Sequence, residues 1–494
     1  MLHIWGFGVR IRSHPIIDFK KRKELPFYFE KKKFVGEEGD TIASALHAAG
    51  VKTLTKSLKY DSPRGFFCGI GKCSSCLMRV NGVPNVRTCI APLKEGITVE
   101  MQDKLGLLPD AKFFDKPKKT LQVNVLVVGA GPAGLCAALE SAQHGASVLL
   151  VDENQCVGGQ LIKQTHKFFG SKQERAGTRG IDIAKELENN VLQLQKEGKI
   201  QVMTDATVIG YYESDKNHRF GVVQRCEYLN SLYDVRCDAA ILACGAMENM
   251  LLFPGNDLPG VYGAGAVQTL MNVYGIRPGD RVLMVGAGNV GLIVSYQLLQ
   301  AGIAVDRVVE AAPVIGGYNV HAAKLRRCGV PIMTSHSIKE VCGDEKVEGA
   351  VIVRLDENWK PIKDSEEYIK CDTICLAVGL TPSTRLLSQI GVDSEYIPEA
   401  GGYVALHDDS MQTSISGIYV AGDASGIEEA STAMIEGKIA GLAAAIDLGC
   451  TKNKKLLTQY REELAHLRAG PFGEKPRIAK KKIAKIKETH HASI

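Results

Sequence analysis

The stretch VNVLVVGAGPAG, residues 123–134, decides the fold of this 494-residue chain. Its first six residues form an apolar, β-branched run of strand length that leads directly into the glycines. A helical pattern follows, and a second apolar run over residues 148–151 ends at Asp152 and Glu153. Strand, glycine turn, helix, strand and acid in this order predict a βαβ unit that binds a dinucleotide.

Each residue of this turn has a specific expected role. Gly129 allows the tight turn, Gly131 lets the backbone approach a pyrophosphate, and Gly134 lets the helix pack closely on the strand. Pro132 and Ala133 open the helix, whose unpaired N–H groups would face the phosphates.

The acids at the end of the second strand are expected to bind the adenosine ribose. Asp152 has the better spacing for this contact, and Glu153 is its neighbour.

Length and composition indicate a soluble protein of about three domains. No apolar run approaches the roughly 20 residues that a membrane span needs, and the N-terminus lacks the pattern of a signal peptide. These features favour a cytoplasmic location, where structural disulfides are rare. Most of the 14 cysteines are therefore expected to be buried small hydrophobic residues.

Four cysteines have ligand spacing. Cys68, Cys73, Cys76 and Cys89 form the pattern C-x4-C-x2-C…C, which is typical of plant-type 2Fe–2S ferredoxins. A tetrahedral zinc site is the alternative, although zinc ligands usually come as two separated C-x2-C pairs. The spacing favours the iron–sulfur cluster.

The first hundred residues around these cysteines predict a small α+β domain. Residues 26–35 alternate apolar and charged positions, and a helix is expected over residues 41–49, with Asp40 as its N-cap. Short strands are expected over residues 77–80 and 97–101.

Three segments of this region carry a family resemblance: EGDTIASAL at 38–46, SPRG at 62–65 and GVPNVRTC at 82–89. They resemble the alpha subunits of heteromeric flavin-dependent amine dehydrogenases and oxidases. This family includes sarcosine oxidase alpha, dye-linked proline and hydroxyproline dehydrogenases, opine oxidases and hydrogen cyanide synthase. The resemblance extends over nearly the whole chain.

The resemblance implies an α/β fold, namely the two-dinucleotide-binding-domain flavoprotein fold (three-layer ββα), preceded by an α+β 2Fe–2S ferredoxin-like domain. It also implies further cofactor-binding residues. These are Gly159 and Gln160 after the ribose acid, Gly245 where the chain leaves the first domain, and Gly422 and Asp423 in a second flavin-binding motif.

A second glycine motif repeats the first. Gly286, Gly288 and Gly291 follow a strand over 281–285, and a later strand ends at Glu310. An acid at that point would pair with a ribose 2′-OH and repel a 2′-phosphate, so NAD would be preferred to NADP. In the family that the chain resembles, this second domain is often empty, and its occupancy stays open.

The expected domain order follows from these motifs. It is a 2Fe–2S domain at 1–105, a linker at 106–120, an FAD or dinucleotide domain at 121–250 and 376–450, a second dinucleotide domain at 251–375, and a basic C-terminal arm at 451–494. The arm has twelve Lys and Arg against four Asp and Glu. Without interleaved aromatic residues it does not favour nucleic acid, and a solvated helix or an arm that docks on a partner subunit is expected.

The sequence contains cofactor sites but no recognisable catalytic constellation, so the catalytic residues are unknown. Disulfide reductase chemistry is disfavoured, because no C-x4-C follows the glycine pair at 158–159 and no C-x2-C lies in 250–375.

We therefore expect the electron-handling subunit of an amine or amino-acid dehydrogenase. A D-amino-acid-oxidase-like beta subunit would oxidise the amine, and the isolated chain would not. The expected cofactors are a 2Fe–2S cluster and FAD, with NAD or ATP as alternatives in the same first site. The resemblance also allows FMN at the subunit interface and a small additional iron–sulfur subunit. A self-contained NADH:acceptor reductase and a structural scaffold that holds NAD or ATP are the other two hypotheses.

Overall fold

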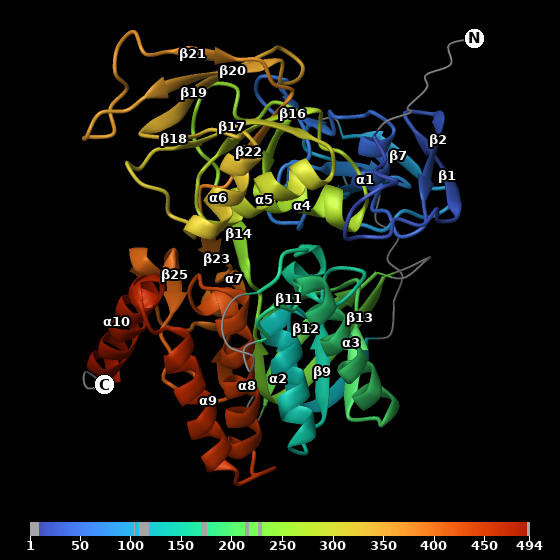
Figure 1. Cartoon of the computed structure of the whole chain (residues 1–494). Helices are drawn as coiled ribbons and strands as arrows, with labels where there is room; N and C mark the ends of the chain where they lie inside the picture. The colour runs from blue at the N-terminus through green and yellow to red at the C-terminus, as the bar shows by residue number, and fades with distance from the viewer. Residues whose placement is uncertain are drawn as a thin grey trace. The chain divides into compact units, whose positions relative to one another are not determined.

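The computed structural model describes residues 9–102, 104–107, 118–168, 175–212, 217–225 and 230–491. The chain divides into two compact units, each made of two separate segments (Figure 1). The first unit comprises residues 1–113 and 248–379, and the second comprises 114–247 and 380–494. Most of the linker expected at 106–120 lies outside the described residues, and Lys119 already begins a strand.

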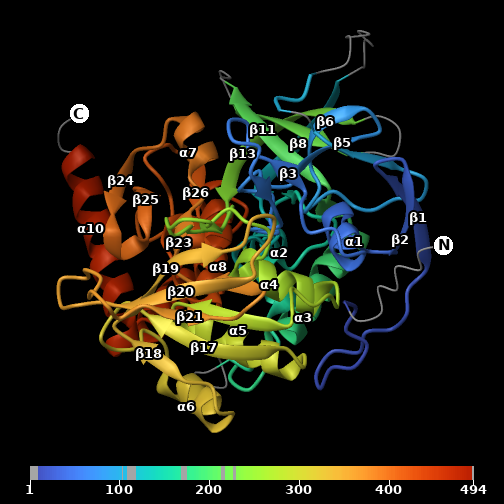
Figure 2. The ribbon, with the colours of Figure 1, turned by 90° about the horizontal axis from the view of Figure 1, so that it is seen from above.

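The N-terminal part of the first unit is built on a five-stranded sheet in the order β2-β1-β7-β5-β6. Its elements are β1 (Glu24–Phe29), β2 (Lys32–Glu37), α1 (Ile42–Ala48), β3 (Thr55–Lys56), β4 (Pro63–Arg64), β5 (Leu77–Val80), β6 (Val83–Arg87) and β7 (Thr98–Met101). The alternating stretch 26–35 is a hairpin, because Glu30 and Lys31 both have positive φ and turn the chain back. Helix α1 lies beside the β1–β2 hairpin in both ribbon views (Figures 1 and 2).

The prediction of Asp40 as the N-cap of α1 is wrong. Thr41 is the N-cap, and its side chain and that of Ser44 form a reciprocal capping box. The Asp40 carboxylate is instead paired with Arg10 and Arg22, and long-range charge decides its orientation.

The rest of the first unit is a dinucleotide-type domain. A parallel sheet in the order β15-β22-β16-β17-β18 is joined by an antiparallel sheet, β19-β20-β21. The strands are β15 (Val261–Gly263), β16 (Arg281–Val285), β17 (Ala304–Glu310), β18 (Ile332–Thr334), β19 (His336–Cys342), β20 (Gly349–Arg354), β21 (Glu367–Ile369) and β22 (Thr373–Leu376). The helices are α4 (Ala264–Gln268), η2 (Thr269–Val273), α5 (Asn289–Gln300) and α6 (Asn319–Arg327).

The two parts of the first unit share one hydrophobic core. Phe66 from the N-terminal part and Tyr262 and Ala266 from the dinucleotide part are fully buried in the same cluster. The backbone N–H of Gly263 donates to the carbonyl of Phe67 at 3.0 Å. The cysteine-bearing loop is therefore held directly against β15 and α4.

The second unit is organised around a seven-stranded sheet, β10-β9-β8-β13-β12-β11, with β26 paired to β13. Its elements up to β14 are β8 (Lys119–Val128), α2 (Pro132–Gln143), β9 (Val148–Val151), η1 (Gly159–Lys163), α3 (Gly180–Lys196), β10 (Ile200–Met203), β11 (Ala206–Tyr212), β12 (His218–Gln224), β13 (Ser231–Leu242) and β14 (Ala246–Glu248). The strands β10, β9, β8, β13 and β26 are parallel, and β11 and β12 extend the sheet as an antiparallel meander.

The chain returns to this unit after the second domain. The returning elements are β23 (Leu380–Pro382), α7 (Arg385–Ile390), β24 (Ser394–Ile397), η3 (Pro398–Ala400), β25 (Gly402–Ala405), β26 (Ile418–Val420), η4 (Gly422–Ser425) and α8 (Ala430–Asp447). Strand β23 pairs with β14, and α8 packs along α2.

The basic C-terminal segment forms helices that pack on the chain itself. They are α9 (Lys454–Leu467) and α10 (Glu474–His491), with the short turn η5 (Pro471–Gly473) between them. Ile483 of α10 is buried in a cluster with Ile397 and Leu406, whereas Ile478 is exposed. One face of α10 thus docks on the β24–β25 hairpin.

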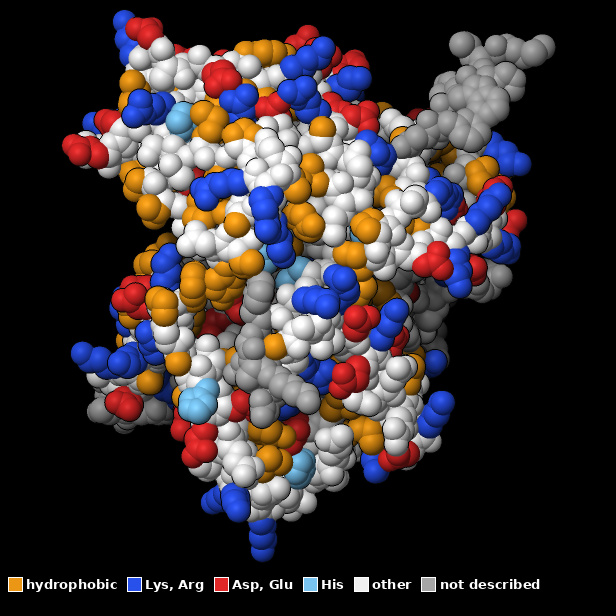
Figure 3. All heavy atoms as spheres, in the orientation of Figure 1, with side chains coloured by type: hydrophobic (Ala, Val, Ile, Leu, Met, Phe, Trp, Pro, Cys, Tyr) orange, Lys and Arg blue, Asp and Glu red, His pale blue; other side chains and the backbone are white. Residues whose placement is uncertain are grey.

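Among the described residues, no helix combines the length and apolar character that crossing a bilayer requires. On the face in Figure 3, acidic and basic side chains are interspersed.

Candidate cofactor sites

In the first glycine turn, two glycines have no room for a side chain and the third has free space beside it. Gly129 has a φ of +102°, and a Cβ placed on it would lie 2.3 Å from the carbonyl oxygen of Ala243. A Cβ on Gly134 would lie 1.7 Å from the carbonyl oxygen of Gly129. A Cβ on Gly131 would meet only the Cα of Gly159, at 4.0 Å. Gly129 and Gly134 are thus required by the fold, whereas the space beside Gly131 is available to a ligand.

Asp152 is bonded to this turn. One carboxylate oxygen accepts from the N–H of Ala130 at 2.6 Å, and the other accepts from the N–H of Asn154 at 2.8 Å. Burial raises the pKa of Asp152. Glu153 is only partly buried, and its carbonyl accepts a hydrogen bond from Arg225. Of the two predicted acids, the structure places Asp152 at the turn.

The glycine pair that follows is packed against the same turn. The N–H of Gly158 donates to the carbonyl of Ala130 at 2.8 Å. Gly159 has a φ of +52°, and a Cβ on it would lie 2.6 Å from the Cα of Gly131. Gln160 is exposed at the start of η1. A side chain at position 159 would obstruct the turn.

The second flavin-type motif meets the start of α2. A Cβ on Gly422 would lie 2.8 Å from the Cβ of Ala133. Asp423, next in the chain, is partly buried, and burial together with the nearby Glu436 and Glu428 raises its pKa to about 7. Gly245 has a φ of +64°, and its carbonyl accepts a hydrogen bond from the N–H of Ser383. This bond joins the point where the chain leaves the second unit to the point where it returns to that unit.

The second glycine motif repeats the construction of the first. A Cβ on Gly286 would lie 2.3 Å from the carbonyl oxygen of Ala377, and one on Gly291 would lie 2.0 Å from that of Gly286. A Cβ on Gly288 would have nothing within 4 Å. The carboxylate of Glu310 accepts from the N–H of Ala287 at 2.7 Å, as Asp152 accepts in the first turn.

The four predicted cysteine ligands lie together in the N-terminal part. Cys68 is in hydrogen-bond contact with both Cys73 and Cys89, and Cys76 is in contact with Cys89. The same contacts lower the pKa of the Cys68 and Cys76 thiols and raise the pKa of the Cys73 and Cys89 thiols. No set of three or more His, Cys, Asp and Glu side chains within the described ranges could hold one metal ion as the side chains stand.

The loop around these thiols directs backbone N–H groups at sulfur. The N–H of Ile70 donates to Cys68 at 3.5 Å, and that of Gly71 donates to Cys89 at 3.3 Å. Gly69 and Gly71 have positive φ, as the tight loop requires. Such hydrogen bonds stabilise the negative charge that four thiolates and a cluster carry, so the residues fit a 2Fe–2S group.

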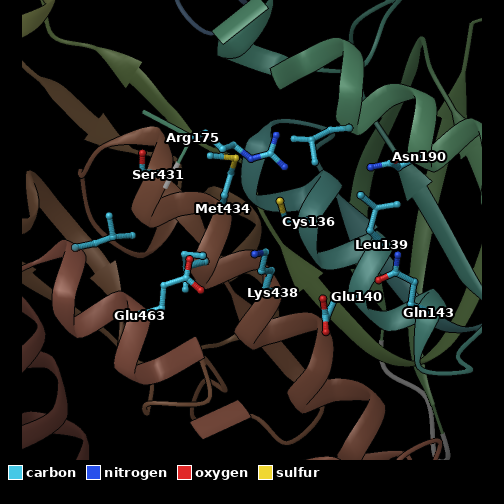
Figure 4. Close-up of a pocket in the computed structure, with 13 residues that line it drawn as sticks. Cys136, Leu139, Glu140, Gln143, Arg175, Asn190, Ser431, Met434, Lys438 and Glu463 are labelled. Atoms are coloured by element: carbon cyan, nitrogen blue, oxygen red, sulfur yellow. The ribbon is translucent and has the colours of Figure 1, made fainter. Parts of the chain in front are cut away.

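A pocket of about 170 Å³ lies elsewhere in the second unit, between α2, α3, α8 and α9 (Figure 4). Cys136, Glu140, Lys438 and Glu463 are among its lining residues. None of the predicted site residues lines it.

The sequence reasoning missed two features beside the first turn. The first is the pair Gly437 and Gly441 on α8, where a Cβ would lie 2.1 and 2.4 Å from the carbonyl oxygens of Ala133 and Ala137. Their i, i+4 spacing is a recognisable sign of close helix packing. The second is a buried ion cluster around Glu436, which no spacing in the sequence indicates.

Two family models match separate parts of the chain. Residues 123–437 match the family described as "Pyridine nucleotide-disulphide oxidoreductase", and residues 22–104 match the "2Fe-2S iron-sulfur cluster binding domain". These matches imply FAD or NAD binding in the larger part and a 2Fe–2S cluster in the smaller one.

Curated relatives include proteins named as subunits of sarcosine oxidase and opine oxidase. The alpha subunit of sarcosine oxidase from Rhizobium meliloti (strain 1021) is 26% identical over 503 residues, covering 89% of this chain and 47% of the relative. An opine oxidase subunit from Agrobacterium tumefaciens (strain Ach5) is 28% identical over 355 residues, 70% of each chain. The chain spans about half the length of the sarcosine oxidase relatives that it matches.

Solved structures share the fold. L-proline dehydrogenase from P. horikoshii superposes with a TM-score of 0.68 at 24% identity, covering 92% of this chain and 79% of that one. Thioredoxin reductase from T. acidophilum gives 0.52 at 21% identity, with 66% and 99% covered. The predicted fold class and the predicted relationship to sarcosine and opine oxidase subunits are therefore confirmed.

Proposed function

The chain belongs to the pyridine nucleotide-disulphide oxidoreductase family, and from that premise we propose that it is the electron-carrying subunit of a heteromeric flavin-dependent amine or amino-acid dehydrogenase. A partner subunit would oxidise a proline, hydroxyproline, sarcosine or opine type of substrate. The observation that carries this proposal is the thiol loop. Four cysteines with sulfur-directed N–H groups lie in the same chain as an open dinucleotide turn.

The first turn is the proposed binding site for FAD. Gly131 leaves room for the pyrophosphate, Asp152 lies where the ribose would bind, and Asp423 would hydrogen-bond the ribityl–pyrophosphate region. Pro132 and Ala133 place the N-terminus of α2 beside the phosphates. When bound, FAD supplies two-electron chemistry that these side chains cannot perform.

The cysteine loop is the proposed exit for electrons. Cys68, Cys73, Cys76 and Cys89 would each ligate iron as thiolates, and the N–H groups of Ile70 and Gly71 would stabilise them. A 2Fe–2S cluster transfers one electron at a time, so it would divide an electron pair for an external acceptor.

The proposed partner is a D-amino-acid-oxidase-like beta subunit, with FMN at the interface. A small additional iron–sulfur subunit would be a further component. Support comes from the relatives, which are named as subunits of sarcosine and opine oxidases. The described residues of this chain carry cofactor motifs and no constellation that would orient an amine. We therefore assign amine oxidation to the partner.

One observation favours a second candidate function, a self-contained NADH:acceptor reductase. The space beside Gly288 is open, and Glu310 occupies the position of a ribose acid. NADH bound there would make the chain active without a partner.

The experiment that tests the proposal uses the purified chain with and without its candidate partner. The nucleotide is extracted and identified, and iron and acid-labile sulfide are measured. Dye reduction is then followed with proline, hydroxyproline, sarcosine, opines and NADH in separate assays. We expect amine-dependent dye reduction only with the partner. Flavin bleaching by NADH in the chain alone would favour the reductase, and amine turnover by the chain alone would overturn the proposal.

A further inference from the structure

Glu436 is a buried carboxylate that touches the second flavin-type motif. It lies on α8 and is 2% exposed. One carboxylate oxygen accepts from the backbone N–H of Gly422 at 2.9 Å and from the hydroxyl of Ser425 at 2.7 Å. These two residues are the first and last of η4, the turn that also holds Asp423. The position of this turn therefore depends on where Glu436 is held.

The other oxygen of Glu436 is bound by two cations from the C-terminal segment. Lys480 of α10 approaches it at 2.8 Å, and Arg468, the C-cap of α9, approaches it at 2.5 Å. Arg468 also forms a two-pronged contact with Glu428, at 2.8 and 2.6 Å. Two cations and two carboxylates thus balance each other in the interior.

Lys480 makes direct contacts with the turn as well. Its ammonium donates to the hydroxyl of Ser425 at 2.8 Å and to the carbonyl of Ser425 at 3.1 Å. It also lies 3.3 Å from Nε2 of His407, whose pKa is lowered by burial so that the ring stays neutral. With four contacting atoms from three residues around one ammonium group, Lys480 has little freedom of position.

The energetics of buried charges favour a role for this cluster in positioning the turn from Gly422 to Ser425. Burying charged groups costs desolvation energy that ion pairing only balances, so such a cluster contributes geometric definition more than stability. The residues that it orders are Gly422, Asp423 and Ser425, and a Cβ on Gly422 would lie 2.8 Å from that of Ala133 at the start of α2. The match to the family model ends at residue 437, so both cations lie beyond the matched residues.

We propose that Lys480 and Arg468 are positioning residues of the first dinucleotide site, which they act on through Glu436 by fixing the Gly422–Ser425 turn. The C-terminal helices are then a component of the cofactor site. This inference rests on the proposed function, because it requires that a dinucleotide binds at the first glycine turn.

The test compares Lys480→Met and Arg468→Met with the control Lys482→Met. Lys482 lies on the same helix and pairs with Glu399 at the surface, so its loss removes a cation without disturbing the cluster. The readouts are the amount of dinucleotide retained after desalting and its dissociation rate. The iron and sulfide content reports separately on the first unit.

We expect the dinucleotide to dissociate about tenfold to a hundredfold faster from the Lys480→Met and Arg468→Met proteins, because a buried carboxylate loses a partner that holds it. Lys482→Met should match the wild type, and Lys480→Arg should restore part of the retention. Iron content should stay constant throughout. A role in stability alone would lower the melting temperature and leave the dissociation rate unchanged.

A milder variant keeps the test decisive if Lys480→Met fails to fold. Ser425→Ala removes one hydroxyl that both Glu436 and Lys480 contact, without leaving a buried charge unpaired. It should raise the dissociation rate by a smaller factor. Wild-type dissociation from both Lys480→Met and Ser425→Ala, or from Ser425→Ala where Lys480→Met does not fold, would overturn this inference alone. A wild-type chain that carries no dinucleotide would overturn the proposed function and this inference with it.

Discussion

A Cβ atom on Gly134 would lie 1.7 Å from the carbonyl oxygen of Gly129, so helix α2 and the turn before it are in direct backbone contact. At Gly131, between them, the nearest atom that a Cβ would meet is 4.0 Å away. The same motif therefore combines two positions that the fold requires with one that only a ligand would constrain.

The first prediction concerns stability. Gly134→Ala forces a methyl group against backbone that cannot rotate away, so the free energy of unfolding should fall by about 3 kcal/mol or more. Thermal and denaturant unfolding of the dinucleotide-free protein would measure this loss. Gly288→Ala is the control and should change stability by less than about 1 kcal/mol, because nothing lies within 4 Å of its Cβ. Equal stability of the two variants would contradict the assignment of Gly134 to packing.

The second prediction concerns the nucleotide. Gly131→Val should fold, since its side chain starts in open space, but it should lose the bound dinucleotide because the branched side chain enters the space meant for phosphates. Flavin absorbance and extracted nucleotide per chain are the measurements. Gly288→Val, in the second motif, should leave this nucleotide in place. Full occupancy in Gly131→Val would show that the dinucleotide binds elsewhere.

The third prediction concerns the cluster. Cys76→Ser should abolish the visible absorption of the 2Fe–2S centre and electron flow to dyes, while the dinucleotide stays bound, because the ligands lie in the first unit and the first turn lies in the second. Cys328→Ser is the matched control, since Cys328 is an exposed cysteine of the same unit. Zinc without acid-labile sulfide in the wild type would show that the cysteines hold a different metal.

The fourth prediction concerns pH. The pKa of Asp423 is raised from 3.8 to about 7 by burial, so the folded chain holds a proton that the unfolded chain releases. The folded state without dinucleotide should therefore lose stability as pH rises from about 4 to 7, by up to a few kcal/mol. Asp423→Asn cannot titrate, and the difference in unfolding free energy between variant and wild type should change over this range.

Burial alone would raise the pKa of Glu436, but Lys480 and Arg468 together outweigh it and lower the pKa to about 2, so the shift is opposite to that of Asp423. Its contribution is lost only below about pH 4, so it stays constant between pH 5 and 8, where the difference between Asp423→Asn and wild type is measured. A difference between Asp423→Asn and wild type that does not vary with pH would rule out this titration.

Several elements were predictable because short-range patterns encode them. The strand over 281–285 has the bounds of β16, and the strand over 148–151 has those of β9. The helix expected over 41–49 is α1, but its cap was misassigned. Capping depends on competition, and Arg10 and Arg22 attract Asp40 from outside the local sequence.

The sequence by itself determined the two glycine motifs, the grouping of four cysteines and the order in which these motifs follow one another. Each motif depends on residues close together in the chain. Only the tertiary structure decided that Phe66 and Tyr262 share one core, and that Lys480 and Arg468 meet Glu436 beside Gly422. These contacts join segments far apart in the chain. The residues that make these contacts are ordinary hydrophobic or charged residues, which could pack or pair with many different partners. Only burial in a particular packing arrangement selects one partner for each.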